Sequence, residues 1–119
     1  MIFNIDKIEH IYLTTSPIDF RKRVNGLVGH ISDFLYLNPS SSSIFLFTNK
    51  RRTSIKIIYY ETNGYWLFEK TLLNRDKFRW PHKDERTAIV LSAEQLEWLL
   101  RGMEITPKHE FKTVKSIYK

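Results

Sequence analysis

The stretch 44–81 constrains the fold more than any other part of the chain, because its pattern is typical of antiparallel strands separated by turns. Its three runs of β-branched and aromatic residues are Ile44–Phe47, Ser54–Glu61 and Tyr65–Leu72. Asn63-Gly64 lies between the last two runs and favours a tight hairpin, because both central residues of such a turn need positive φ. The sequence therefore predicts a sheet built around a hairpin, and we expect this sheet to present the function.

Apolar residues at the helical period predict one long helix before this stretch. Ser16, Pro17 and Asp19 favour a helix start, since they suit the cap, the first helical position and the positive end of the helix dipole. The apolar face that follows consists of Phe20, Val24, Leu27, Val28, Ile31, Phe34 and Leu35. Asn38-Pro39 is expected to end the element.

Further strands and a second helix are predicted on either side. The alternation over Ile8–Thr14 predicts a first strand, and Thr87–Leu91 predicts a last one. Ser92 and Gln95 have the spacing of a capping box, which predicts a helix after them. The predicted fold class is therefore α+β: an antiparallel sheet of about five strands packed against one long helix, with a second C-terminal helix.

The composition predicts a single folded domain. A chain of 119 residues with 42% hydrophobic residues can form one core, which we assign to residues 1–105. Residues 106–119 are basic and weakly patterned, which predicts a C-terminal tail. Cysteine is absent, which removes disulfides and thiolate chemistry. No apolar run approaches a membrane span and the start lacks a signal-peptide pattern, so we expect a cytoplasmic protein without membrane contact.

The residues predict neither a metal site nor an enzyme. The histidines lie far apart in the sequence and lack the spacing of metal ligands. Gly26 and Gly29 lie within the predicted helix instead of in a phosphate-binding loop. Glu61 and Glu69 are interpreted as solvated strand residues or as cross-strand partners of Lys70 or Lys56. We therefore assign no catalytic residue, metal or cofactor, and a small metal-dependent nuclease is the least favoured function.

The charge balance favours an anionic partner such as DNA. The formal net charge is +6, and Lys50-Arg51-Arg52 fall in one predicted loop, where they repel each other unless an anion or solvent screens them. Further cations open the predicted helix or follow the hairpin, whereas the sheet's aromatic residues are interpreted as core. The residues predicted to contact phosphates are Arg21, Lys22, Lys50, Arg51, Arg52 and Lys56, and Lys56 is expected to project into solvent.

Short motifs along most of the chain resemble a known family in their order and spacing. They include Asp19-Phe20-Arg21-Lys22, Gly26-Leu27, Asn38-Pro39, Ile44-Phe45-Leu46-Phe47, Asn49-Lys50-Arg51-Arg52, Ile55-Lys56, Phe78-Arg79-Trp80-Pro81, Leu91-Ser92, Gln95-Leu96 and Leu99-Leu100-Gly102, with Gly64, Leu67, Lys70 and Leu72 in the hairpin. Together they resemble the small TnpB accessory protein, the second-open-reading-frame product, of the insertion-sequence-66 family of bacterial mobile elements. Each motif is short, and it is their combination that is specific.

The resemblance implies a cytoplasmic bacterial protein that is encoded beside a separate, larger transposase and is needed for efficient transposition. It brings no catalytic residues. Tyr60-Glu61 stands where the family usually has Trp-Asp, Ser41–Ser43 lacks the usual glycine, and Thr71 replaces a usual arginine of the basic surface.

Two hypotheses about the function remain open at this point. The first is a non-catalytic accessory protein for transposition of a bacterial insertion sequence, which contacts DNA, the transposase or both. The alternative is an interaction module that binds the transposase or forms a homodimer without touching DNA.

Overall fold

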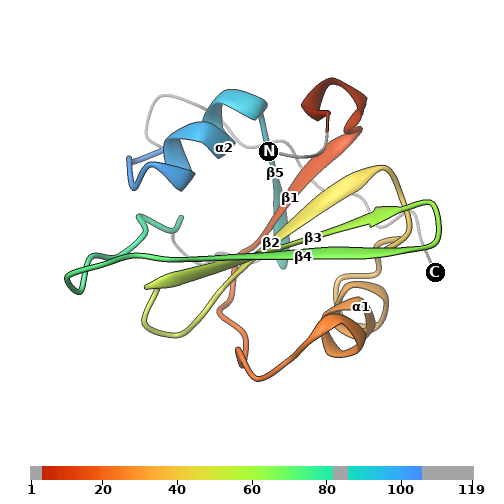
Figure 1. The fold of residues 1–119 in the computed structure, drawn as a ribbon, viewed down its shortest axis with the longest axis horizontal. Coiled ribbons are helices and arrows are strands. Elements are labelled where there is room, and N and C mark those ends of the chain that lie inside the picture. The colour runs from red at the N-terminus through yellow and green to blue at the C-terminus, as the bar shows by residue number, and fades with distance from the viewer. Residues whose placement is uncertain (1–3, 82–85, 106–119) are drawn as a thin grey trace.

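Figure 1 shows one sheet with a helix on each face, in a computed structural model that describes residues 4–81 and 86–105. The strands are β1 (His10–Thr14), β2 (Ser43–Thr48), β3 (Ser54–Glu61), β4 (Gly64–Thr71) and β5 (Ala88–Leu91). The helices are α1 (Val24–Asp33), α2 (Ala93–Leu100) and the short 3-10 helix η1 (Ile5–Lys7). The strand order is β4-β3-β2-β1-β5. The predicted α+β class and the five strands are confirmed, while the predicted tail over 106–119 lies outside the described residues.

The sheet is mixed, so the prediction of a wholly antiparallel sheet is wrong for one strand pair. β1 and β2 pair in parallel, with Ile11 opposite Ile44 and Leu13 opposite Leu46. The chain between them crosses over through α1, as a parallel connection requires. The β1–β5, β2–β3 and β3–β4 pairs are antiparallel.

The first helix begins later than predicted, at Val24 instead of at Ser16. The Asp19 carboxylate accepts a hydrogen bond from the Arg21 backbone N–H, at 2.9 Å, which forms a turn. The Ile18 N–H donates to the Thr48 carbonyl, at 3.0 Å, and so holds this segment beside the end of β2. The polar residues that suggested a helix start therefore form a loop, and the helix is shorter than expected.

The two faces of the sheet carry separate cores. On the α1 face, Leu27 and Ile31 of the helix pack with Tyr12, Phe45 and Ile58 of the strands. Phe34 was predicted in this apolar face, but it lies just after α1 and is 52% exposed.

The other face of the sheet is covered by α2. Leu96 and Leu99 of this helix pack with Ile11, Leu46 and Trp80. The predicted C-terminal helix therefore covers the face of the sheet opposite α1. No helix within residues 4–81 and 86–105 has the length and apolar character needed to cross a bilayer.

The predicted hairpin is confirmed, although its turn lies one residue earlier. Glu61 pairs with Gly64, so Thr62 and Asn63 form the two-residue connection between β3 and β4. Positive φ falls on Thr62, at 54°, and on neither Asn63 nor Gly64. The Asn-Gly signal therefore located the hairpin but not the residue with the left-handed backbone.

Candidate nucleic-acid interface

Four segments meet at one end of the sheet because of the strand directions. β1 and β2 end there, and the antiparallel partners β3 and β5 begin there, while β4 ends there. The segments are 15–23, 49–53, 72–81 and 86–87. In Figure 1 the turn after β2 and the segment after β4 lie on the left, away from the β3–β4 turn on the right.

Backbone hydrogen bonds join these segments to one another. The Phe78 N–H donates to the Arg52 carbonyl, at 2.8 Å, and so links the segment after β4 to the turn after β2. The Thr15 N–H donates to the Thr87 carbonyl, at 3.1 Å, and the Trp80 Nε1–H donates to the Thr14 carbonyl, at 3.0 Å. The end of the sheet is therefore one connected structure, not four independent loops.

The connected segments are rich in cations, and we call this surface the basic end. Its cations are Arg21, Lys22, Arg23, Lys50, Arg51, Arg52, Arg75, Lys77, Arg79 and Arg86. Asp19 and Asp76 are the acids of these segments. All of the cations are exposed except Arg52 and Arg86, which are partly buried.

The opposite end of the sheet has a different charge. Its segments 4–9, 34–42 and 61–63 carry Asp6, Glu9 and Glu61, and Lys7 is their one cation. The positive charge of the described residues therefore gathers at one end of the strands, which creates a directed field for an anionic ligand.

Five of the six residues predicted to contact phosphates lie at the basic end. Lys50 and Arg51 are exposed in the turn after β2, and Arg21 and Lys22 are exposed in the segment before α1. The Arg21 side chain is paired with Asp19, at 2.6 Å between Nη2 and Oδ2. These hydrogen bonds, together with the Arg21 backbone bond and positive charge, lower the pKa of the Asp19 carboxyl to about 2.

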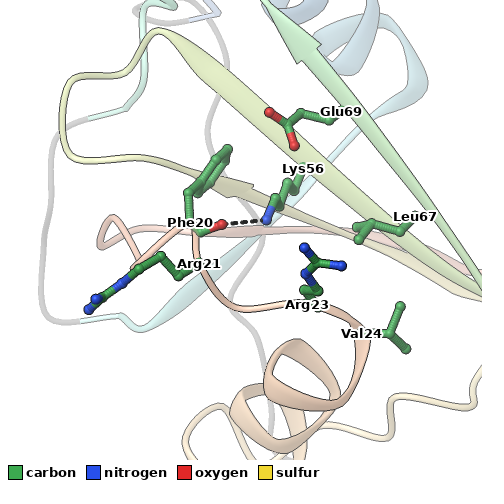
Figure 2. A pocket seen from close by; sticks show the side chains of 7 residues that line it. All are labelled: Phe20, Arg21, Arg23, Val24, Lys56, Leu67 and Glu69. Atoms are coloured by element: carbon green, nitrogen blue, oxygen red, sulfur yellow. Dashed lines mark hydrogen bonds between the residues drawn. The ribbon is translucent and has the colours of Figure 1, made fainter.

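Lys56 does not project into solvent, so that expectation is wrong. The residue is 5% exposed, and its Nζ donates to the carbonyls of Phe20 and Lys22, at 2.7 and 2.8 Å. The ammonium also lies 4.7 Å from the centroid of the Phe20 ring. Figure 2 shows the side chain reaching from β3 to the loop before α1. Lys56 therefore fixes the loop that carries Arg21 and Lys22.

A hollow of about 590 Å³ lies beside this lysine, on the α1 face of the sheet. Its lining residues are Phe20, Arg21, Arg23, Val24, Lys56, Leu67 and Glu69. In Figure 2 the Arg23 side chain rises from the loop toward Lys56, whereas the Arg21 side chain points away. Glu69 lies opposite Lys56 in the β3–β4 register, as the interpretation of a cross-strand partner expected. The hollow is thus lined by three cations and one carboxylate, and it lies beside the basic end.

The remaining acids and histidines do not converge on a cation site. Within the described part of the chain, no group of three or more His, Cys, Asp or Glu side chains could hold a metal ion. Glu61 accepts a hydrogen bond from the Trp66 indole, at 3.0 Å. Burial, followed by the charge of Lys22, lowers the pKa of His30, whose ring stacks on Phe34.

Only part of the basic end was predictable from the amino-acid sequence. Arg75, Lys77, Arg79 and Arg86 also belong to the basic end, although they are not among the six residues predicted to contact phosphates. Their place beside Lys50 and Arg51 depends on the parallel β1–β2 pair and on where β4 ends. Clusters of Lys and Arg flanking predicted strand ends are the signal that could have found them.

The fold and this surface define a small α+β protein with a cation-rich end, and comparison with known proteins places it more closely. The family described as IS66 Orf2-like protein, TnpB_IS66, matches residues 9–110. This chain belongs to that family. It is 33% identical over 96 residues to uncharacterized protein y4jC of Sinorhizobium fredii, a match that covers 81% of this chain and 80% of the relative.

A second relative gives the same result. Uncharacterized protein y4hO of Sinorhizobium fredii is 32% identical over 94 residues, which covers 79% of this chain and 80% of the relative. No solved structure matches the chain.

Proposed function

We propose that the protein is a non-catalytic accessory factor in transposition of a bacterial insertion sequence, and that it binds DNA phosphates through the basic end. Membership of the IS66 Orf2-like family supports the role in transposition. The observation that carries DNA binding is the gathering of cations from four separate segments onto one end of the sheet. The element's transposase is the expected protein partner, in the same cytoplasmic complex.

The proposed contact is with the DNA backbone. Exposed Lys and Arg side chains on loops of different length can follow phosphates, and they bind by releasing counterions from the DNA. Lys50, Arg51, Arg21 and Lys22 are exposed and so can reach phosphates directly. Lys56 acts differently, since its ammonium holds the loop of Arg21 and Lys22 in place.

A salt titration of DNA binding tests this proposal. Each lost phosphate contact lowers the slope of log affinity against log salt by about 0.9 for duplex DNA. The Lys50→Gln/Arg51→Gln/Arg52→Gln variant is therefore expected to bind more weakly, with a slope reduced by about 2 to 3. Affinity and slope equal to those of the unaltered protein would contradict the proposal.

A matched pair of single variants controls for net charge. Arg51→Gln at the basic end and Lys7→Gln at the opposite end remove one exposed cation each. Arg51→Gln should weaken DNA binding and Lys7→Gln should leave it nearly unchanged. Equal losses would show that the total charge, and not the basic end, governs binding. Pull-down of the tagged protein with the transposase and element-end DNA then tests the protein partner separately.

A further inference from the structure

The two outer strands of the sheet, β4 and β5, differ in length. β5 has 4 residues and β4 has 8. Within residues 4–81 and 86–105, β3 is the one strand that pairs with β4. A long outer strand presents a row of backbone N–H and C=O groups to solvent, which is a template for another strand.

β4 has few of the features that prevent such pairing. It contains no proline, and its charged residues, Glu69 and Lys70, lie near its end. The Lys70 ammonium donates to the Leu100 carbonyl at the end of α2, at 2.7 Å. Its charge therefore lies over the face of the sheet, and not at the outer edge of β4 where it would oppose pairing. Residues 64–68 therefore form an uncharged outer strand.

Exposed apolar side chains lie along the same strand. Trp66, in β4, is 46% exposed, and Leu73, two residues after its end, is 78% exposed. A strand placed antiparallel beside β4 would run past Trp66 and remove apolar surface from water.

We propose that β4 pairs antiparallel with β4 of a second copy, so that one continuous sheet runs through a two-fold symmetric dimer. A two-fold axis at Leu67 or at Phe68 leaves only one residue of β4 unpaired. With the axis at Leu67, Trp66 faces Phe68 of the other copy. With the axis at Phe68, Trp66 faces Lys70 of the other copy. In the first arrangement the indole meets an aromatic ring, and in the second it meets the aliphatic part of the Lys70 side chain, whose ammonium stays bound to the Leu100 carbonyl of its own chain.

Charge favours this antiparallel arrangement over other ways of joining two copies. Each chain has a formal net charge of +6, so an interface that brought two basic ends together would be repulsive. Antiparallel pairing of β4 places the basic ends at opposite ends of the shared strands. It also places Glu61, at the end of β3, at the end of the shared strands where the basic end of the other copy lies. The antiparallel arrangement therefore keeps the two basic ends apart.

The dimer would carry two basic ends that face in opposite directions. If each binds DNA as proposed above, one dimer can hold two DNA segments apart from each other. The dimer itself does not depend on DNA binding, and its test is made without nucleic acid.

The mass of the full chain in solution tests the dimer. Sedimentation equilibrium at micromolar concentrations should give twice the 14.3 kDa of one chain. Trp66→Lys should raise the dimer dissociation constant at least tenfold, because an added cation would face Lys70 or the apolar edge. Phe34→Lys, which alters a similarly exposed aromatic residue after α1, should leave the constant unchanged. Circular dichroism confirms that both variants fold.

Cysteine cross-linking locates the axis, because the chain has no cysteine of its own. Directly opposed residues of an antiparallel pair have Cα atoms about 4.5–5.5 Å apart, which suits a disulfide. Either Leu67→Cys or Phe68→Cys should therefore form an interchain disulfide on mild oxidation, and Phe34→Cys should not. A monomer at all concentrations, or a dimer that tolerates Trp66→Lys and forms neither disulfide, overturns the proposal.

Discussion

A helix begins at each end of the sheet, and the two helices differ in how their N-termini are capped. At the basic end, α1 begins after Arg23, whose side chain makes no capping hydrogen bond. At the opposite end, α2 begins after Ser92, which forms a complete capping box with Gln95. Cations near a helix N-terminus are unfavourable, since they meet the positive end of the helix dipole. The basic end therefore departs from what local stability favours.

The backbone conformation of two arginines at the basic end is also locally unfavourable. Arg52 and Arg75 have φ of 61° and 62°, a region where glycine is favoured and a long side chain is uncommon. Tyr36 and Thr62 also have positive φ elsewhere, so the conformation by itself does not mark the basic end. What distinguishes the basic end is that cations occupy positions where other residues would be more stable. Such departures are expected where function restricts the choice of residue.

The largest effect on stability is expected from Lys56, which supports the basic end from inside the sheet. Lys56→Met removes the donor for two carbonyls, and the free energy of unfolding should fall by about 2–4 kcal/mol. Lys50→Met, which removes an exposed cation, should change it by less than about 0.5 kcal/mol. Urea denaturation measures both. Hydrogen exchange should also accelerate at residues 18–27 in the Lys56 variant, and equal effects of the two variants would contradict the buried role.

The caps of the two helices should respond in opposite directions. Ser92→Ala removes both capping interactions, and it is expected to lower the free energy of unfolding by about 1 kcal/mol. Arg23→Ser introduces a cap and removes a cation from the helix N-terminus, and it is expected to raise that free energy by about 0.5–1 kcal/mol. Ser42→Ala, at an exposed serine, is the control. Loss of stability in the Arg23 variant would show that its cation is structural, which would remove the contrast between the ends.

A pair of glycine variants separates stability from binding. Arg52 and Thr62 both have positive φ, one at each end of the sheet. Arg52→Gly and Thr62→Gly should each stabilise the fold by about 0.5–1 kcal/mol, since glycine adopts this backbone without steric cost. Thermal denaturation measures the gain. Only Arg52→Gly should also weaken DNA binding in a mobility-shift assay. Weaker binding by both variants would contradict the proposal that DNA binds at the basic end and not at the opposite end.

The sequence was sufficient for the elements that local pattern controls. The hairpin, the strands and the capping box of α2 were predicted because alternation, turn residues and cap spacing act within a few positions. The parallel pairing of β1 with β2 was not predicted, because it depends on the path of the whole crossover. Ser16, Pro17 and Asp19 were misread for a similar reason. Asp19 can cap a turn as readily as a helix, and the bond from Ile18 to Thr48 is a long-range contact.

The candidate site was predictable in composition but not in arrangement. The Lys50-Arg51-Arg52 turn followed from its place between two strands. The exposure of Lys56 was predicted wrongly, because period-2 alternation shows which face of the sheet a residue lies on but not what covers that face. In the structure Phe20 and the loop before α1 cover it. A lysine in a strand flanked by Ile55, Ile57 and Ile58 is a signal for a buried amine with backbone partners, since its neighbours are buried on both faces.

The smallest expected effect concerns acid stability at the basic end. Hydrogen bonds from Arg21 hold the pKa of Asp19 at about 2, below its usual value of 3.8. A depressed pKa in the folded state stabilises the fold above about pH 4, and this contribution is lost as the pH falls toward 2. Asp19→Asn should therefore flatten the acid side of the stability profile slightly. In an NMR titration, Arg21→Gln should raise the pKa of Asp19 toward 3.8 while Lys50→Gln leaves it unchanged. Because the Asp19 side chain is half exposed, equal shifts in both variants would mean that the summed charge of the basic end, and not the bond to Arg21, sets this pKa.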